Sequence, residues 1–253
     1  MRNNGRVPTY RDAAVVLRTH KLGEADRIVT MLTRENGKLR AVAKGVRRTS
    51  SKFGARLEPF SHIDIQLATG RTLDVVTQAV SLNAFGQKLI GDYPRYTAGE
   101  AMLEMADRLV TEEREPALQQ YRLLVGALRV LDSGTTSDGP RPAPMVLDSY
   151  LLRSLAIAGY APSFGPCARC GTVGPHQAFS PAAGGVVCET CRPAGSARPA
   201  EQTLRLLGAL LEGDWPATRE VEPFAIKQAS GLTAAYATWH LDRNLKSLAH
   251  VER

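Results

Sequence analysis

The sequence predicts an α+β protein in which a small β-barrel is followed by a helical domain with a four-cysteine insertion. Between residues 13 and 80, five short segments are rich in β-branched and aliphatic residues, and none has a helical repeat. Helical periodicity begins near residue 83 and returns at intervals up to the C-terminus. All four cysteines stand in one stretch, 165–192. We therefore expect a barrel domain at 1–82 and a helical domain at 83–253.

The predicted strands cover residues 13–19, 27–33, 38–44, 61–67 and 73–80. Asn36 and Gly37 separate the second strand from the third, and this pair favours a tight hairpin because both residues tolerate positive φ. In the fourth strand apolar and polar residues alternate, which predicts one face toward the core and one, with His62, toward solvent. Five short strands of this kind are typical of an OB-type barrel.

The predicted helices cover residues 96–110, 117–131, 145–158, 201–212 and about 226–248. Their apolar residues recur at three-and-four spacing, which is typical of a packed core. Residues 132–144 are dense in glycine, serine and proline, and we expect a mobile polar loop there.

The four cysteines form two pairs, Cys167-x2-Cys170 and Cys188-x2-Cys191, separated by seventeen residues. This spacing is typical of a zinc ribbon, in which each pair closes a tight knuckle and the chain between them forms a hairpin. Gly171 fits the first knuckle, because a residue after the second ligand often needs a left-handed backbone. Four sulfur ligands leave no position for water, so one structural Zn²⁺ per chain is expected at 165–192.

Other interpretations of the cysteines carry less weight. Two redox disulfides are the alternative, although a disulfide within one CxxC pair is short, strained and easily reduced. A zinc deaminase requires His-x-Glu upstream of its cysteines, and no histidine upstream of Cys167 is followed by glutamate at that spacing.

Composition indicates a globular protein with an uneven charge distribution. The chain has 253 residues, of which 43% are hydrophobic and 23% charged. It contains no apolar run of membrane-spanning length and begins without the apolar core of a signal peptide, so we expect a cytoplasmic protein with reduced thiols. Residues 1–83 carry 15 Lys and Arg against 7 Asp and Glu, whereas residues 84–253 carry 17 against 18. The N-terminal third is therefore expected to meet a polyanion.

Basic residues concentrate on the third strand and the loop that follows it. Side chains there can bind phosphates without reading sequence, and a solvated surface of mixed charge is the alternative. Phe53 lies in the same run, where it either stacks on a base or anchors the loop. His62 is a weaker candidate for a ligand contact. The candidate DNA-binding residues, all within nineteen positions, are Lys38, Arg40, Lys44, Arg47, Arg48, Lys52 and Arg56.

The sequence offers little support for catalysis. It lacks a phosphate-binding GxxxxGK[ST], a GxSxG elbow and an HExxH helix, and its five histidines are scattered singly. We expect a protein that is not an enzyme.

Several segments resemble the RecO family of bacterial recombination mediators. The matching segments in the N-terminal third are 23–29 (GEADRIV), 33–38 (TRENGK), 43–48 (AKGVRR), 51–53 (SKF) and 57–60 (LEPF). The resemblance continues through the helices, the four cysteines and a closing LKS at 245–247, so that it covers nearly the whole chain.

The resemblance implies an OB-fold domain, a helical domain and an embedded zinc ribbon. It implies a nucleoid-associated protein that binds single- and double-stranded DNA, anneals complementary strands and acts with RecR to load RecA on DNA coated by the single-strand binding protein. DNA-contact roles transfer to Lys38, Lys44, Arg47, Arg48 and Lys52, and zinc ligation transfers to the four cysteines. The main alternative is a zinc-ribbon adaptor whose basic third binds an acidic protein, and a further one is a nucleic-acid-modifying enzyme.

Overall fold

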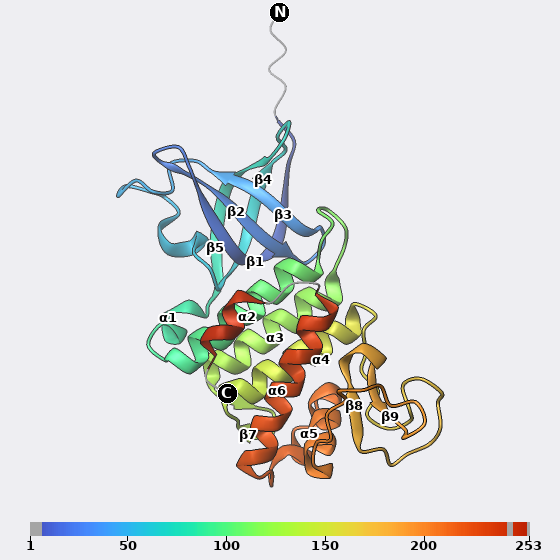
Figure 1. Cartoon of the computed structure of the whole chain (residues 1–253). Coiled ribbons are helices and arrows are strands. Elements are labelled where there is room, and N and C mark those ends of the chain that lie inside the picture. The colour runs from blue at the N-terminus through green and yellow to red at the C-terminus, as the bar shows by residue number, and fades with distance from the viewer. Residues whose placement is uncertain (1–6, 242–244, 252–253) are drawn as a thin grey trace, which may run out of the picture.

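The computed structural model describes residues 7–241 and 245–251, and it places a five-stranded barrel against one end of a helical bundle (Figure 1). All five predicted strands are present. The turn between the second and third has Gly37 in the left-handed region, with φ of +62°. The strands are β1 (Thr9–Leu22), β2 (Asp26–Thr33), β3 (Gly37–Ala43), β4 (Ser61–Ala68) and β5 (Asp74–Ala84).

The strand order β1-β2-β3-β5-β4 closes into a barrel, because β1 pairs with β4 as well as with β2. Four of the five ladders are antiparallel. The fifth joins β3 to β5 in parallel through two residue pairs only, Ala41 with Asp74 and Val42 with Val75. This is the five-stranded barrel that the sequence predicts, and it closes through a short ladder, or seam, between β3 and β5.

Alternation along β3 sets the inner and outer faces of the barrel. Leu39, Ala41 and Ala43 are buried in the barrel core, whereas Arg40 and the following Lys44 are exposed. Successive strand residues point to opposite faces, so the apolar side chains fill the interior and the basic ones project outward.

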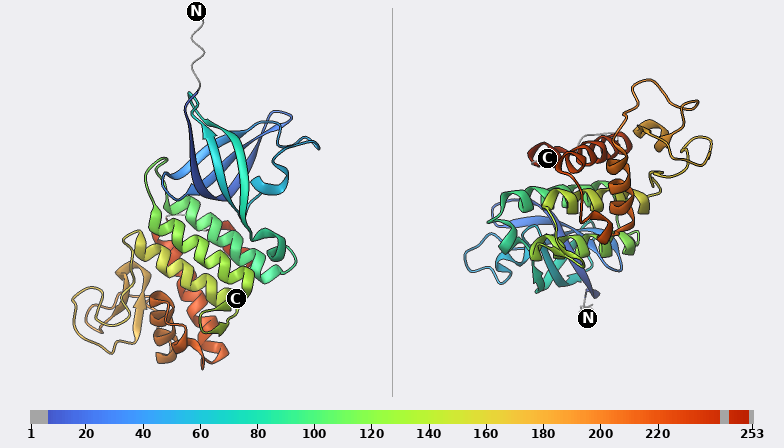
Figure 2. Two further views of the ribbon diagram at one scale, coloured as in Figure 1. Left: turned by 180° about the vertical axis from the view of Figure 1, so that it is seen from behind. Right: turned by 90° about the horizontal axis from the view of Figure 1, so that it is seen from below.

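The bundle is organised around α4, which packs against α2, α3, α5 and α6 (Figure 2). Most of α4 is buried because its residues are apolar almost all round, as expected for a central helix. Among the described residues, no helix is both long and apolar enough to cross a membrane. The helices are α1 (Gly86–Leu89), α2 (Tyr93–Leu109), α3 (Leu118–Ser133), α4 (Ala143–Ile157), α5 (Glu201–Glu212) and α6 (Pro223–His240).

Two segments of the helical part differ from their predicted structure. The helix predicted at 226–248 ends at His240, and residues 242–244 lie outside the described part. A 3-10 turn, η4 (Lys246–His250), follows, and the backbone N–H groups of Lys246 and Ser247 donate to the Glu104 carboxylate of α2. The loop predicted to be mobile at 132–144 forms a small hairpin, β6 (Thr135–Thr136) with β7 (Gly139–Pro140). Asp138 anchors that hairpin, because its carboxylate pairs with Arg141 at 2.9 Å and also with Arg219.

The cysteine-rich segment projects from one side of the bundle and carries the predicted hairpin (Figure 2). Its strands are β8 (Ala178–Ser180) and β9 (Gly185–Val187). Phe179 of β8 stacks on Phe164, with ring centroids 5.9 Å apart, and also contacts Tyr236 of α6. The hairpin therefore shares its core with the bundle.

Candidate nucleic-acid interface and metal centre

Five of the seven predicted basic residues are exposed in the segment between β3 and β4, and we call this set the basic edge. Two backbone bonds fix where it begins: Gly45 N donates to Asp26 Oδ1 at 2.7 Å, and Arg47 N donates to Ala25 O at 3.0 Å. These bonds hold the segment that follows β3 against the turn between β1 and β2. The basic edge consists of Lys44, Arg47, Arg48, Lys52 and Arg56.

The charges of the basic edge have no acidic partners among the described residues. Arg47 donates to the carbonyl of Glu24 at 2.7 Å, Lys52 to that of Thr77 at 3.0 Å, and Arg56 to that of Lys52 at 2.9 Å. A carbonyl orients a cation but carries no negative charge, so these three contacts leave the cations without an acidic partner.

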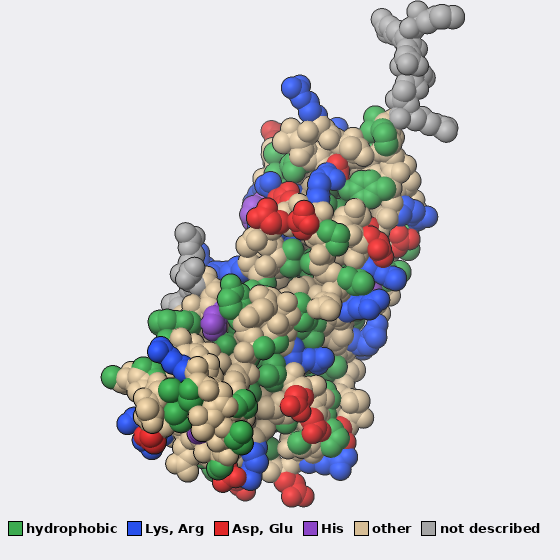
Figure 3. Space-filling view, turned by 90° about the vertical axis from the view of Figure 1, so that its right-hand side faces the viewer, with side chains coloured by type: hydrophobic (Ala, Val, Ile, Leu, Met, Phe, Trp, Pro, Cys, Tyr) green, Lys and Arg blue, Asp and Glu red, His purple; other side chains and the backbone are tan. Residues whose placement is uncertain are grey.

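Three other arginines of the barrel differ, because carboxylates accompany them. Arg11 pairs with Asp64 at 3.4 Å, Arg34 with Glu35 at 3.1 Å, and Arg27 with Glu58. The face shown in Figure 3 likewise carries acidic and basic side chains side by side. The basic edge thus differs from these three arginines in bringing five cations without a carboxylate partner, among the described residues, into one short segment, 44–56.

The other two predicted residues contact the helical part instead. Lys38 donates to the backbone carbonyl of Asp107 at 2.9 Å, and its side chain is only 12% exposed. Arg40 is exposed but pairs with Glu113 in the loop between α2 and α3. We therefore leave Lys38 out of the candidate interface and treat Arg40 as its border.

Phe53 and His62 both lie in the interior. Phe53 is 2% exposed and packs with Leu57 in the barrel core, so it anchors the loop, and Lys52 Nζ lies 5.0 Å from its ring centroid. His62 is 7% exposed and hydrogen-bonds with Tyr121 and Asn83, at 2.8 Å each. The prediction that His62 faces solvent is wrong because α3 covers this end of β4. Its burial, with the nearby charge of Arg129, lowers the pKa of His62.

Two residues of the basic edge, Lys52 and Arg56, line one wall of a groove of about 520 Å³, which Glu58 also lines. Residues 51–56 supply that wall, and the end of β5 with α1 supplies the other through Asn83, Gln87 and Ile90. Ile90 is 73% exposed, so the second wall offers an apolar contact beside two basic residues. Sequence reasoning missed this wall, because its small and polar residues have no distinctive pattern.

The four cysteines come together at the tip of the ribbon. Their sulfur atoms all lie within 4.8 Å of one another, and Cys170 Sγ lies 3.8 Å from Cys188 Sγ. Zn–S bonds of about 2.3 Å place the corners of a tetrahedron about 3.8 Å apart, so the donor set fits the ion. Gly171 has φ of +73°, as predicted for the first knuckle.

The electrostatics of this cluster also favour a cation. Backbone N–H groups of Cys188 and Cys170 lower the pKa of the Cys167 thiol. Hydrogen bonds with Cys170 and Cys188 raise the pKa of Cys191, because a proton shared among the sulfurs is retained. Four adjacent thiolates repel one another, and a bound divalent ion removes that cost.

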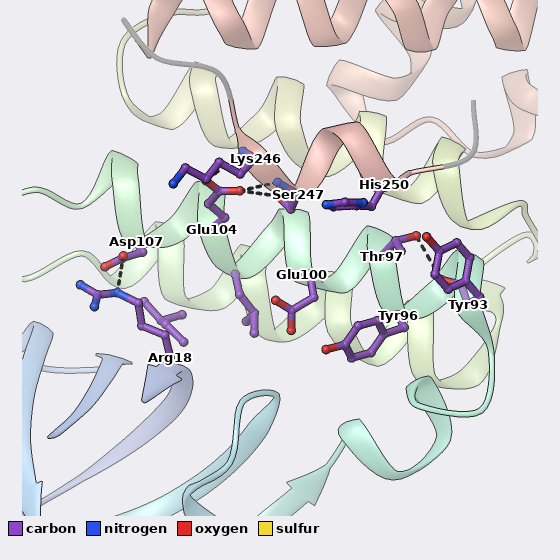
Figure 4. A pocket seen from close by; sticks show the side chains of 12 residues that line it. Arg18, Tyr93, Tyr96, Thr97, Glu100, Glu104, Asp107, Lys246, Ser247 and His250 are labelled. Carbon is purple, nitrogen blue, oxygen red and sulfur yellow. Dashed lines mark hydrogen bonds and ion pairs between the residues drawn. The ribbon is translucent and has the colours of Figure 1, made fainter. Parts of the chain in front are cut away.

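A second cavity of about 550 Å³ lies between β1, α2 and η4 (Figure 4). Glu104 forms one side of it and accepts hydrogen bonds from Lys246 N at 3.1 Å and from Ser247 N at 2.9 Å. Asp107, one turn further along α2, accepts from Arg18 Nε of β1 at 2.7 Å. Helix α2 therefore holds the C-terminal turn on one side and the barrel on the other.

Comparison with known families accounts for nearly all of the chain. Residues 7–85 match the family model described as recombination protein O N terminal, and residues 90–249 match the one described as recombination protein O C terminal. The chain belongs to the RecO family. It is 62% identical over 247 residues to the DNA repair protein RecO of Cutibacterium acnes, covering 98% of this chain and all of the relative. It is also 62% identical to the DNA repair protein RecO of Nocardioides sp., covering 96% and 99% of the two chains.

Glu104 of this RecO-family chain is expected to make stability depend on pH. Burial acts to raise the pKa of Glu104, but hydrogen bonds from Ser247 and Lys246 outweigh it and hold the pKa below its ordinary value. Its stabilising effect is therefore present above the unfolded pKa of about 4.3 and is lost as pH falls through the lower folded value. Glu104→Gln should lower stability at pH 7 by about 1–3 kcal/mol. Melting temperatures measured from pH 7 to pH 3 should show the gap closing in acid.

Glu100 offers a matched control in the same cavity. Burial raises the pKa of Glu100, so its charge opposes folding at pH 7. Glu100→Gln should therefore raise the melting temperature at pH 7. A gap between parent and Glu104→Gln that stays constant down to pH 3 would contradict the assignment.

Proposed function

We propose that this chain is a non-catalytic mediator of recombination and DNA repair that binds DNA through the basic edge. The observation that carries the proposal is the run of five cations without a carboxylate partner among the described residues. Membership of a family whose relatives are named DNA repair proteins supports the same role. Such a protein would act on chromosomal DNA at the nucleoid.

The mechanism follows from phosphate neutralisation. Lys44, Arg47, Arg48, Lys52 and Arg56 displace counterions from the DNA backbone, which binds single- and double-stranded DNA without reading sequence. Neutralised strands repel one another less, so complementary bases can meet and pair. The protein then supplies proximity, while base pairing supplies specificity.

Partner proteins complete this proposed role. With RecR, the chain would help load RecA on DNA coated by the single-strand binding protein, and the helical part would hold these proteins. The ion held by the four cysteines would be a structural Zn²⁺, because four sulfur ligands leave no open position for chemistry. We assign no catalytic residue.

Replacing Arg47 and Arg48 together by alanine should weaken binding to a single-stranded oligonucleotide. The logarithm of affinity should also fall less steeply with the logarithm of salt concentration, by about 0.7 to 0.9 per lost phosphate contact. Fluorescence anisotropy at several salt concentrations measures both quantities. The matched control is Arg11→Ala with Arg34→Ala, which removes the same charge from two arginines that already have acidic partners.

If the affinity of the two double variants depends equally on salt concentration, the assignment of DNA binding to the basic edge is wrong. If the parent shows no salt-dependent binding near physiological ionic strength, the zinc-ribbon adaptor becomes the better explanation. Degradation or modification of the oligonucleotide, seen on a gel with zinc and magnesium present, would point to an enzyme. Annealing of complementary strands coated by single-strand binding protein, with and without RecR, then tests the mediator role itself.

A further inference from the structure

The loop between α2 and α3, residues 110–117, covers the part of β3 that β5 leaves free. β5 pairs with β3 only at Ala41 and Val42, so the first half of β3 is not covered by β5. There the loop adds a parallel bridge between Lys38 and Glu113, and Arg114 N donates to Lys38 O at 3.0 Å. The helical part thus extends the barrel sheet at its seam (Figure 1).

Two further contacts fix the loop in this place. The Arg114 guanidinium donates to Asp74 Oδ2 at 2.8 Å, and Asp74 is 1% exposed. Gly37 leaves room for the loop, because a Cβ there would lie 1.7 Å from the carbonyl oxygen of Glu115. Arg114 has φ of +67°, a backbone conformation that residues other than glycine adopt rarely. The loop is therefore seated by specific contacts on both sides of the seam.

The seated loop carries an acidic surface next to the proposed DNA interface. Its exposed carboxylates are Glu112, Glu113 and Glu115. Glu113 pairs with Arg40, which shares the outer face of β3 with Lys44. Arg40 and Lys44 are four strand residues apart, or roughly 13 Å. The cation nearest the basic edge along β3 is thus neutralised by a carboxylate from the helical part.

We infer that the α2–α3 loop is an acidic guard that holds Arg40 out of the DNA interface, so that the interface ends at Lys44. This inference rests on the proposed DNA binding and adds a determinant of its extent. A phosphate that approaches Arg40 must displace the Glu113 carboxylate and meets the charges of Glu112 and Glu115 beside it. The acidic guard thereby directs a DNA strand away from the contact between barrel and bundle and toward the groove at residues 51–56.

Glu113→Gln tests the guard because it removes the carboxylate and keeps the size of the side chain. Affinity for a single-stranded oligonucleotide should rise about two- to fivefold, as expected when one exposed ion pair is released. The salt dependence should steepen by about 0.7, the value of one additional phosphate contact on a single strand. Glu112→Gln is the matched control, since it makes the same charge change at an exposed glutamate for which the described residues provide no ion-pair partner. It should leave the slope unchanged.

A double-mutant cycle with Arg40→Ala tests whether the higher affinity and steeper salt dependence of Glu113→Gln come from Arg40 itself. Arg40→Ala should change the slope little in the parent and should abolish the gain in the Glu113→Gln background. Equal behaviour of Glu113→Gln and Glu112→Gln would overturn the inference. The inference would also be overturned if Arg40→Ala in the parent lowered the salt dependence by the value of one phosphate contact, because Arg40 would then already touch DNA. A parent without salt-dependent binding would instead overturn the proposed function.

Discussion

Replacing Cys167 and Cys188 by serine is expected to unfold the ribbon while the barrel remains folded. Each substitution removes one ligand from a different knuckle, so neither remaining half can complete a tetrahedron. Zinc binding to small structural sites contributes about 10–16 kcal/mol of apparent free energy at pH 7, and most of that stabilisation should be lost. Elemental analysis should find about one zinc per chain in the parent, as a single four-sulfur site requires, and almost none in the variant.

The ribbon is also where hydrogen exchange should respond first. Phe179 and Val186 belong to the core of the bundle, so loss of the metal should expose amides in β8 and β9 and then in α6. His176→Ala is the control, because it changes an exposed side chain of the ribbon that lies outside the cluster and leaves the four sulfurs in place. Parent protein purified without chelator that contains far less than one zinc would argue against the site.

Phe53→Ala should destabilise the barrel by about 3–5 kcal/mol, the range for truncating a buried aromatic residue. Phe53 is 2% exposed and packs with Leu57 inside the barrel, so its removal leaves a cavity beneath the basic edge. Urea denaturation followed by far-UV circular dichroism measures the loss. Phe224→Ala makes the same chemical change at a phenylalanine that is 56% exposed, and it should alter stability by no more than about 0.5 kcal/mol.

The same pair of variants separates an anchoring role of Phe53 from base stacking. If Phe53 anchors the loop, DNA affinity falls only as the barrel loses stability, and conditions that restore folding restore binding. A fully stable Phe53→Ala variant that binds single-stranded DNA poorly would show that the ring reaches a base.

Local sequence patterns were enough to predict most elements. The alternation along β3, the two CxxC pairs and the left-handed Gly171 depend on neighbours only a few residues away, and each is present as expected. The strands differ from their predicted bounds mainly at the ends. Such features are encoded by periodicity and spacing, which a single chain displays directly.

Contacts distant in sequence account for what was missed. The sequence around Arg40 gives no sign of an acidic partner, because that partner, Glu113, lies 73 residues later. The alternation along β4 predicts that His62 faces solvent. Tyr121 lies 59 residues away in sequence, and only the packing of α3 against the barrel brings its hydroxyl to 2.8 Å from His62. Neither contact leaves a local signal, because both arise where the barrel meets the bundle.

The hold of Glu104 on the C-terminal turn bears on the order in which the chain can fold during its synthesis. All barrel ladders lie between Thr9 and Ala84, so the barrel has its partners early. Glu104, by contrast, bonds the backbone at Lys246 and Ser247, 142 and 143 residues further on. A ribosome releases the N-terminal part first, so α2 emerges long before these donors exist. The contacts of α2, which also packs against β1, are therefore completed only after residues 246 and 247 have been made. Contacts of such long sequence separation raise the contact order of the bundle, which is expected to slow its folding.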